Sequence, residues 1–291
     1  GLNDIIRSIV LELYYGYGVR RIYGIKYGMQ GFIPSYGHDV VDLEPATVVN
    51  IQDMGGSMLG SSRGPQSIEE IIDTLDRMNI GILFMIGGDG TLKAANLIAK
   101  AIRARDLRIS VIGVPKTIDN DIHMVSRSFG FDTAVEIATQ AIKGAHNEAE
   151  IYPNGIGLIK LMGRHSGFIA ATATLAQQDV NFVLIPEIPV DLEGPEGLFT
   201  KIEARLKDRG HAVIVVAEGA QDRYGNPITA EYVRSVLVDR LGEDTRVTSL
   251  GHVQRGGSPS AFDRYLSTVL GYAAVTAFRQ LTEERAKREI R

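Results

Sequence analysis

Short apolar runs alternate along this chain with segments whose apolar residues recur at helical spacing. Five runs of four to six mostly aliphatic residues stand just before loops that contain Gly, Pro or acidic residues. An uninterrupted apolar run of this length, bounded by turn residues, is typical of a strand that is buried on both faces of a sheet. We therefore predict strands at 82–86, 109–114, 156–161, 182–185 and 212–216.

The segments between these runs have the apolar spacing of amphipathic helices. Ser67 and Glu70 form a capping-box pattern at the start of one of them, and Gly210 stands where another should stop. Strands that alternate with helices in this way indicate an α/β protein with a mostly parallel sheet. Besides the helix after Ser67, we predict helices at 92–104, 133–150, 166–178, 197–209 and 229–241.

Composition excludes several classes of protein. The 31 Lys+Arg against 35 Asp+Glu give a net charge of -4, which argues against a chain that holds nucleic acid by bulk positive charge. The absence of cysteine excludes disulfides, thiolate zinc sites and cysteine nucleophiles, and six scattered histidines without a His-Glu-x-x-His pair give little support to a histidine zinc site. Without a secretory signal or an apolar run of about 18 residues, a cytoplasmic protein with no membrane partner is expected.

The loop Gly87-Gly88-Asp89-Gly90-Thr91 follows the first predicted strand, at the sheet edge where open parallel sheets bind ligands. Its glycines let backbone N–H groups approach phosphate oxygens, and the next helix offers its N-terminus to negative charge. Because Asp89 would repel a phosphate unless a cation stood between them, it is a candidate ligand of Mg²⁺. A plain Gly-Asp-Gly turn is the alternative.

A second loop, 115–121, follows the next strand and carries acidic, basic and hydroxyl side chains. Asp119 comes thirty residues after Asp89, which is one strand-helix-strand unit, so we expect the two carboxylates at neighbouring strand ends. Asp119 as a base, Thr117 as a positioning hydroxyl and Lys116 as a phosphate contact would suit phosphoryl transfer to an alcohol. The alternative is an acidic turn that caps a helix.

Three more loops carry candidate ligand groups. Arg164 at a strand-to-helix junction could clamp an anion, Glu218 directly after a buried strand suits sugar hydroxyls, and His252 with Arg255 among glycines suggests a phosphate cradle. A surface salt bridge, a helix cap and an ordinary loop are the respective alternatives. Five such loops in one α/β chain favour a shared ligand site.

Taken in order, the motifs at 87–91, 115–121, 162–164 and 251–259 resemble the phosphofructokinase family, over Gly1 to about Ala274. The resemblance implies two Rossmann-like α/β lobes with mainly parallel sheets and an active site in the cleft between them. It also implies transfer of the γ-phosphoryl group of MgATP to the 1-hydroxyl of fructose 6-phosphate, in glycolysis.

The resemblance also assigns residues to roles, by motif. The catalytic set is Asp119 as base with Thr117, Lys116 and Asp121 near the transferring group. The nucleotide set is Arg63, Gly88, Asp89, Gly90 and Thr91, with Asp89 as the Mg²⁺ ligand. The substrate set is Thr117, Asp119, Met162, Gly163, Arg164, Glu218, Arg246, His252 and Arg255.

The same resemblance suggests how the chain is organised. We expect a nucleotide-binding lobe at 1–125 that lacks its first strand, a sugar-phosphate lobe at 126–266 and a C-terminal helix at 267–291. In the family, Arg246 and a second arginine reach in from a neighbouring subunit, which implies a homo-oligomer, a dimer or a tetramer. Gly155 stands where that second arginine is expected.

Two positions bear on the phosphoryl donor. The family's ATP users have glycine where this chain has Gly90, since a carboxylate there would crowd the α-phosphate. Lys116 is the residue usual in pyrophosphate users, and the combination resembles the plant and protist ATP-dependent branch. We therefore predict ATP, with a pyrophosphate-dependent enzyme and a noncatalytic sugar-phosphate-binding subunit as alternatives.

Overall fold

The computed structural model describes residues 1–242 and 245–289. The chain divides into two compact units, which we treat separately: unit 1 comprises residues 1–117 and 257–291, and unit 2 comprises residues 118–256. None of the helices within the described ranges combines the length and the apolar character that a membrane crossing needs.

Unit 1 is built on a pair of parallel strands, β3 (Ile82–Gly87) and β4 (Ser110–Pro115). Helices α2 (Ile68–Arg77) and α3 (Asp89–Ala104) pack their apolar faces against alternate β3 residues. The predicted start of α2 is confirmed, because Ser67 is its N-cap and the Ser67 hydroxyl accepts a hydrogen bond from the Glu70 N–H at 3.3 Å.

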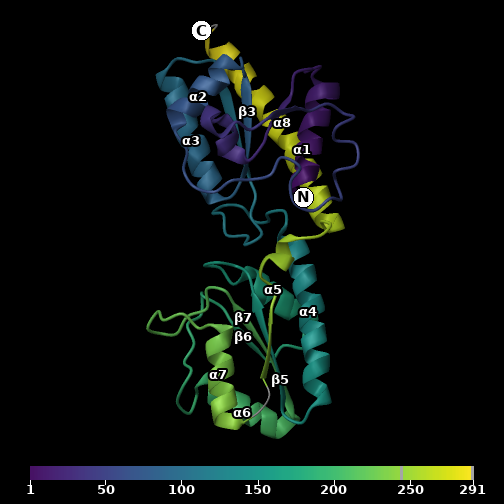
Figure 1. The fold of residues 1–291 in the computed structure, drawn as a ribbon, viewed down its shortest axis with the longest axis vertical. Coiled ribbons are helices and arrows are strands. Elements are labelled where there is room, and N and C mark those ends of the chain that lie inside the picture. The colour runs from purple at the N-terminus through teal and green to yellow at the C-terminus, as the bar shows by residue number, and fades with distance from the viewer. Residues whose placement is uncertain (243–244, 290–291) are drawn as a thin grey trace. The chain divides into compact units, whose positions relative to one another are not determined.

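Two helices from opposite ends of the chain lie side by side in unit 1 (Figure 1): α1 (Leu2–Leu11) and α8 (Ala261–Glu289). Gly271 allows the close approach, since a Cβ at that position would lie 2.6 Å from the Ser8 Cβ. The Ser8 hydroxyl donates to the Thr268 carbonyl at 2.7 Å. The remaining elements of unit 1 are the antiparallel pair β1 (Tyr23–Ile25) and β2 (Val40–Asp42), and the short helical turns η1 (Glu12–Gly16), η2 (Gly28–Phe32) and η3 (Pro34–Tyr36).

Unit 2 is a four-stranded parallel sheet in the order β6-β7-β5-β8. Its strands are β5 (Gly155–Leu161), β6 (Phe182–Leu184), β7 (His211–Ala217) and β8 (Thr245–Ser249). Its helices are α4 (Phe131–Ile151), α5 (Phe168–Gln177), α6 (Leu198–Arg209), α7 (Ala230–Leu241) and the short η4 (Gly251–Arg255).

Helices cover both faces of this sheet, α4 and α5 on one and α6 and α7 on the other (Figure 1). On β7, Val213 and Val215 pack toward α4 and α5, whereas Ile214 and Val216 pack toward α6 and α7. Because successive side chains of a strand point to opposite faces, a strand covered on both sides must be apolar throughout. This is why the uninterrupted apolar runs predict the sheet.

All five predicted strands and all six predicted helices are present, and the α/β class with parallel sheets is confirmed. The unit boundaries differ from those expected at 125/126 and 266/267. Residues 118–125 belong to unit 2, because the Asn120 side chain bonds within the loop to Ser126 and Ser128. Residues 257–266 belong to unit 1, where the Ser258 hydroxyl donates to the Asp53 carbonyl at 2.7 Å and α8 begins.

Candidate functional site

The glycine loop of unit 1 lies at the carboxyl edge of the β3–β4 pair. Gly87 ends β3 beside Pro115 of β4, and its carbonyl accepts a hydrogen bond from the Lys116 N–H at 2.8 Å. A Cβ at Gly87 would overlap the Thr91 side chain, so this turn requires glycine. The loops at 87–91 and 115–117 are therefore neighbours, whereas Asp119 belongs to unit 2, so the expected place of its carboxylate beside Asp89 stays a prediction.

Asp89 is the first residue of α3 and points its carboxylate outward. The side chain is 71% exposed, and its Oδ2 lies 2.6 Å from the Lys93 ammonium one turn along the helix. Around Gly90, no atom lies within 4 Å of where a Cβ would be. The N-terminus of α3 thus offers backbone N–H groups, a carboxylate and an ammonium group beside open space, and Lys93 is a group that the sequence reasoning missed.

The other predicted site residues of unit 1 lie in two separate loops. Arg63 is exposed in the long loop that precedes α2, and Lys116 and Thr117 directly follow β4. The division between the units falls between Thr117 and Ile118, so it separates Lys116 and Thr117 from Asp119.

Asp119 is buried at the start of unit 2, with 7% of its surface exposed. Its carbonyl accepts a hydrogen bond from the Ser166 hydroxyl at 2.8 Å, which ties this loop to the Met162–Gly167 loop. Asn120 has a left-handed backbone (φ 55°) and accepts from the Ser128 N–H at 2.7 Å. These bonds hold the Asp119 backbone in one position, whereas Asp121 is exposed.

The Met162–Gly167 loop meets the loop that carries Glu218. The Arg164 N–H donates to Glu218 Oε2 at 3.1 Å, and a Cβ at Gly219 would overlap the Arg164 carbonyl oxygen. Gly163 (φ 152°) and Arg164 (φ 50°) both have backbone angles that L-residues rarely adopt. Glycine takes such an angle without strain, but Arg164 does not, and a strained backbone persists only where the surroundings fix it, which is typical of functional loops.

The last predicted loop, η4, is fixed to the same edge by Gln254. This side chain is 1% exposed; its Oε1 accepts from the Met162 N–H at 2.7 Å and its Nε2 donates to the Ala134 carbonyl at 3.3 Å. His252 and Arg255, on either side of it, are exposed. Neither Gln254 nor Ser166 was singled out from the sequence, although both lie inside the motifs.

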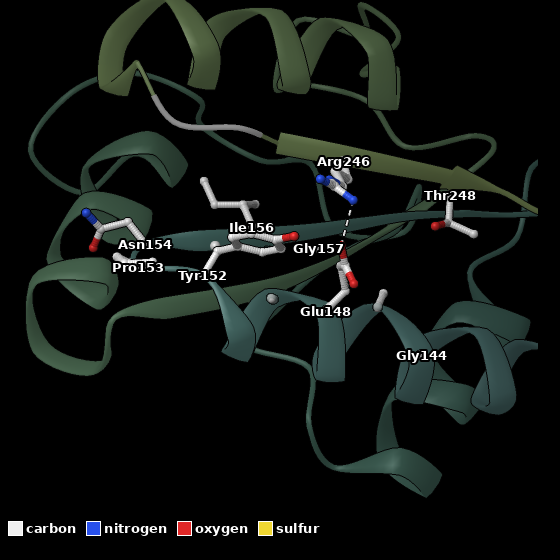
Figure 2. Close-up of a pocket in the computed structure, with 12 residues that line it drawn as sticks. Gly144, Glu148, Tyr152, Pro153, Asn154, Ile156, Gly157, Arg246 and Thr248 are labelled. Carbon is white, nitrogen blue, oxygen red and sulfur yellow. Dashed lines mark hydrogen bonds and ion pairs between the residues drawn. The ribbon is translucent and has the colours of Figure 1, made fainter.

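Arg246 does not join these residues. It lies on β8 beside Gly157 of β5, five residues before Met162, which places it about 16 Å back from the carboxyl edge. Figure 2 shows the Glu148 carboxylate pointing from α4 toward the Arg246 guanidinium, with Oε1 and Nη1 2.6 Å apart. The guanidinium carbon also lies 5.4 Å from the centre of the Tyr152 ring.

The surroundings of Arg246 form an open pocket of about 360 Å³ in unit 2. The α4–β5 connection supplies one wall, including Pro153 and Asn154 (Figure 2). Gly155 starts β5 at this wall, and a Cβ there would overlap the Ala149 carbonyl oxygen. The expected second arginine is therefore not only absent but incompatible with this backbone.

Of the nine predicted residues in unit 2, seven gather near the carboxyl ends of its strands; Asp121 is exposed two residues after Asp119, and Arg246 lies apart. Four loops converge there through Ser166, Gln254 and Glu218. The gathered residues are Asp119, Met162, Gly163, Arg164, Glu218, His252 and Arg255.

Loops of this kind define the class: an α/β protein with loops gathered at the carboxyl edge of parallel strands, where open sheets of this class bind ligands, and with a glycine-rich helix N-terminus in unit 1, a feature typical of anion sites. The family model for Phosphofructokinase matches residues 1–278. The chain belongs to the phosphofructokinase family.

Relatives and solved structures agree with this assignment. An ATP-dependent 6-phosphofructokinase of Borreliella burgdorferi is 53% identical over 77% of this chain and 52% of its own length. ATP-dependent 6-phosphofructokinase 7 of Arabidopsis thaliana is 49% identical over 83% of this chain and 48% of its own. This chain spans about half the length of these curated relatives.

Among solved structures, phosphofructokinase from Pichia pastoris in the T-state has a TM-score of 0.83 at 29% identity, covering 95% of this chain and 31% of its own. A pyrophosphate-dependent phosphofructokinase from Marinobacter aquaeolei has a TM-score of 0.81 at 25% identity, covering 94% of this chain and 72% of its own. The phosphofructokinase fold is therefore confirmed.

Proposed function

We propose that this chain transfers the γ-phosphoryl group of ATP to the 1-hydroxyl of fructose 6-phosphate, giving fructose 1,6-bisphosphate and ADP, as a glycolytic kinase. The observation that carries the proposal is the set of hydrogen bonds joining the Asp119, Met162–Gly167, Glu218 and η4 loops at one edge of unit 2. These are the loops to which the family resemblance assigns the sugar phosphate.

The proposed chemistry in unit 2 centres on Asp119. As the bond between the sugar oxygen and the γ-phosphorus forms and the bond to the β-phosphate oxygen breaks, the Asp119 carboxylate takes the hydroxyl proton. The anchored Asp119 backbone supports this role, because a base acts efficiently only when it is held within reach of the proton. Asp121, exposed beside it, would help to surround the transferring group.

Other side chains of that edge suit the sugar phosphate. Glu218 would accept from a sugar hydroxyl while its Oε2 holds the Arg164 N–H. Met162 and Gly163 would line the sugar, and the Arg164, His252 and Arg255 side chains would bind its oxygens and the 6-phosphate. Charged donors bind phosphate oxygens most strongly when a fixed backbone holds them in place, as the backbone of η4 would hold His252 and Arg255.

In unit 1, Gly88, Gly90 and Thr91 would bind the nucleotide phosphates through the N-terminus of α3, together with Arg63, Lys116 and Thr117. The residues present fit Mg²⁺, which proteins hold through one or two carboxylates plus substrate phosphates, and the exposed Asp89 carboxylate would be such a ligand. The ion, when bound, would neutralise the charge of the phosphates.

ATP as the donor is supported by Gly90 and by the relatives. A side chain at position 90 would project into open space at the N-terminus of α3, where a carboxylate would oppose an α-phosphate. The relatives from Borreliella burgdorferi and Amycolatopsis methanolica are named ATP-dependent enzymes. Lys116 and the Marinobacter structure keep pyrophosphate as the second candidate.

Assembly and location are proposed on narrower grounds. The position of Arg246, far from the carboxyl edge of its own unit, suits a residue that serves a neighbouring subunit, so we propose a homo-oligomer, a dimer or a homotetramer. A site in the cleft between lobes and a cytoplasmic location stay predictions; relatives named as chloroplastic occur in Arabidopsis thaliana.

The test is a steady-state assay of the purified chain with fructose 6-phosphate and Mg²⁺, in which ATP and pyrophosphate are compared and the product is identified by aldolase cleavage. We expect ATP-dependent turnover that Asp119→Ser abolishes almost entirely. Faster turnover with pyrophosphate would reverse the donor assignment. Calorimetric binding of fructose 6-phosphate without turnover from either donor would identify the chain as a noncatalytic binding subunit.

A further inference from the structure

A cluster of metal-ligating side chains lies at the opposite end of unit 2 from the sugar-phosphate loops. His146 and Glu150 stand one turn apart on α4, and His211 is the first residue of β7. One ligand atom from each of the three lies within 4.8 Å of the others. The histidines are 65 residues apart in sequence, so their scattered positions conceal the contact that the packing of α4 on the sheet creates.

The arrangement is close to that of a three-ligand metal site. His146 Nε2 lies 3.5 Å from Glu150 Oε1, and the two imidazole rings are 5.2 Å apart, tilted by 53°. In a tetrahedral zinc site with metal–ligand bonds of about 2.0–2.2 Å, ligand atoms lie about 3.3–3.6 Å apart. Small side-chain rotations, easiest for the 54% exposed Glu150, would close the remaining distance.

Asp179 provides the second feature that metal sites share. Its Oδ2 lies 3.6 Å from His146 Nδ1, the other ring nitrogen of this histidine, and accepts a hydrogen bond from the Gln177 amide at 2.6 Å. Histidines that bind metals almost always donate their other ring N–H to a carboxylate or carbonyl, which fixes the tautomer. A simple ion pair between His146 and Glu150 would need neither Asp179 nor His211.

We propose that His146, Glu150 and His211 bind Zn²⁺ or a similar first-row divalent metal ion, with water in the fourth position and Asp179 orienting His146. Two imidazoles and a carboxylate, without sulfur, suit such ions. His211 begins β7 and Glu218 follows its end, about 23 Å away. The ion would therefore fasten the last turns of α4 to the start of β7, and would not act in phosphoryl transfer.

The experiment is isothermal titration of the purified chain with Zn²⁺, in buffer without Mg²⁺ or nucleotide, beside the variants His146→Gln, His211→Gln and Glu150→Gln. His123→Gln and Glu136→Gln change exposed residues of the same types in unit 2 and serve as matched controls. Co²⁺ as a second probe reports geometry through its visible absorption. We expect one saturable equivalent and a strong tetrahedral Co²⁺ spectrum in the unmodified chain and in both controls.

Each histidine variant should lose this equivalent, and Asp179→Asn should keep the stoichiometry with an affinity about 10–100-fold weaker. Glu150→Gln changes an exposed residue and should weaken binding without unfolding, so it tests the site even if a histidine variant fails to fold. The proposal would be overturned if the unmodified chain showed no saturable Zn²⁺ binding. It would also be overturned if His146→Gln or Glu150→Gln left both the Zn²⁺ binding and the Co²⁺ spectrum unchanged.

Discussion

Gln254→Met tests whether one buried amide joins two of the ligand loops in unit 2. Methionine keeps the approximate length of the side chain but removes the oxygen that accepts from the Met162 N–H at 2.7 Å and the amide that donates to the Ala134 carbonyl at 3.3 Å. A partly buried N–H that loses its partner costs about 1–3 kcal/mol of unfolding free energy. For a unit of this size, we expect the melting temperature to fall by about 2–12 °C.

Three measurements check this expectation: thermal unfolding by circular dichroism, hydrogen exchange of the Met162 amide, and the KM for fructose 6-phosphate. Exchange should accelerate at Met162, and KM should rise because His252 and Arg255 are no longer fixed beside that loop. Gln140→Met, at an exposed site on α4, is the matched control and should change stability by less than about 0.5 kcal/mol. Unaltered amide exchange and KM in Gln254→Met would refute the reasoning.

Three further experiments test the proposed reaction. Asp119→Ser should lower kcat by about 10²–10⁴-fold with a small change in the KM for fructose 6-phosphate, whereas Asp121→Ser should retain most of the activity. If steady-state kinetics of the two variants gave the opposite result, Asp121 would be the base. Gly90→Asp should fold normally, because its Cβ meets open space, but should lose kcat/KM for ATP, and unchanged ATP kinetics would contradict the donor argument. If Arg246 serves the partner subunit in a dimer, Arg246→Ala and Asp119→Ser chains should each be inactive alone. After subunit exchange, half of the dimers are mixed and each has one intact site, so about a quarter of the activity should return. No recovery after exchange would show that Arg246 does not serve the partner's site.

The sequence predicts those strands that are buried along their whole length on both faces. The apolar runs predict β5 and β7 because both faces of these strands are covered by helices. Strand β8 was not predicted by the same pattern. Among the described residues it pairs with β5 alone. Its exposed Arg246 and Thr248 alternate with the more buried Thr245 and Val247, so its pattern is that of a polar edge strand.

The candidate site could be predicted by residue type but not by its connections. Charged and glycine-rich loops after strands identify Asp119, Arg164 and Glu218 as groups for one edge of the sheet. The hydrogen bonds that hold them come from Ser166 and Gln254, whose partners lie 47 and 92 residues away in sequence. Such pairs arise from the packing of separate elements, which spacing along one chain does not encode.

At Gly155 the local backbone explains why the arginine expected from the family resemblance does not fit. The connection from α4 to β5 is so short that the Gly155 N–H donates to the Tyr152 carbonyl at 3.1 Å, and β5 begins against the Ala149 carbonyl. An arginine at 155 would need a different α4–β5 connection, which would also displace Tyr152 from the Arg246 guanidinium. Gly155→Arg alone should therefore destabilise unit 2 rather than add a phosphate ligand, because its Cβ would overlap the Ala149 carbonyl oxygen.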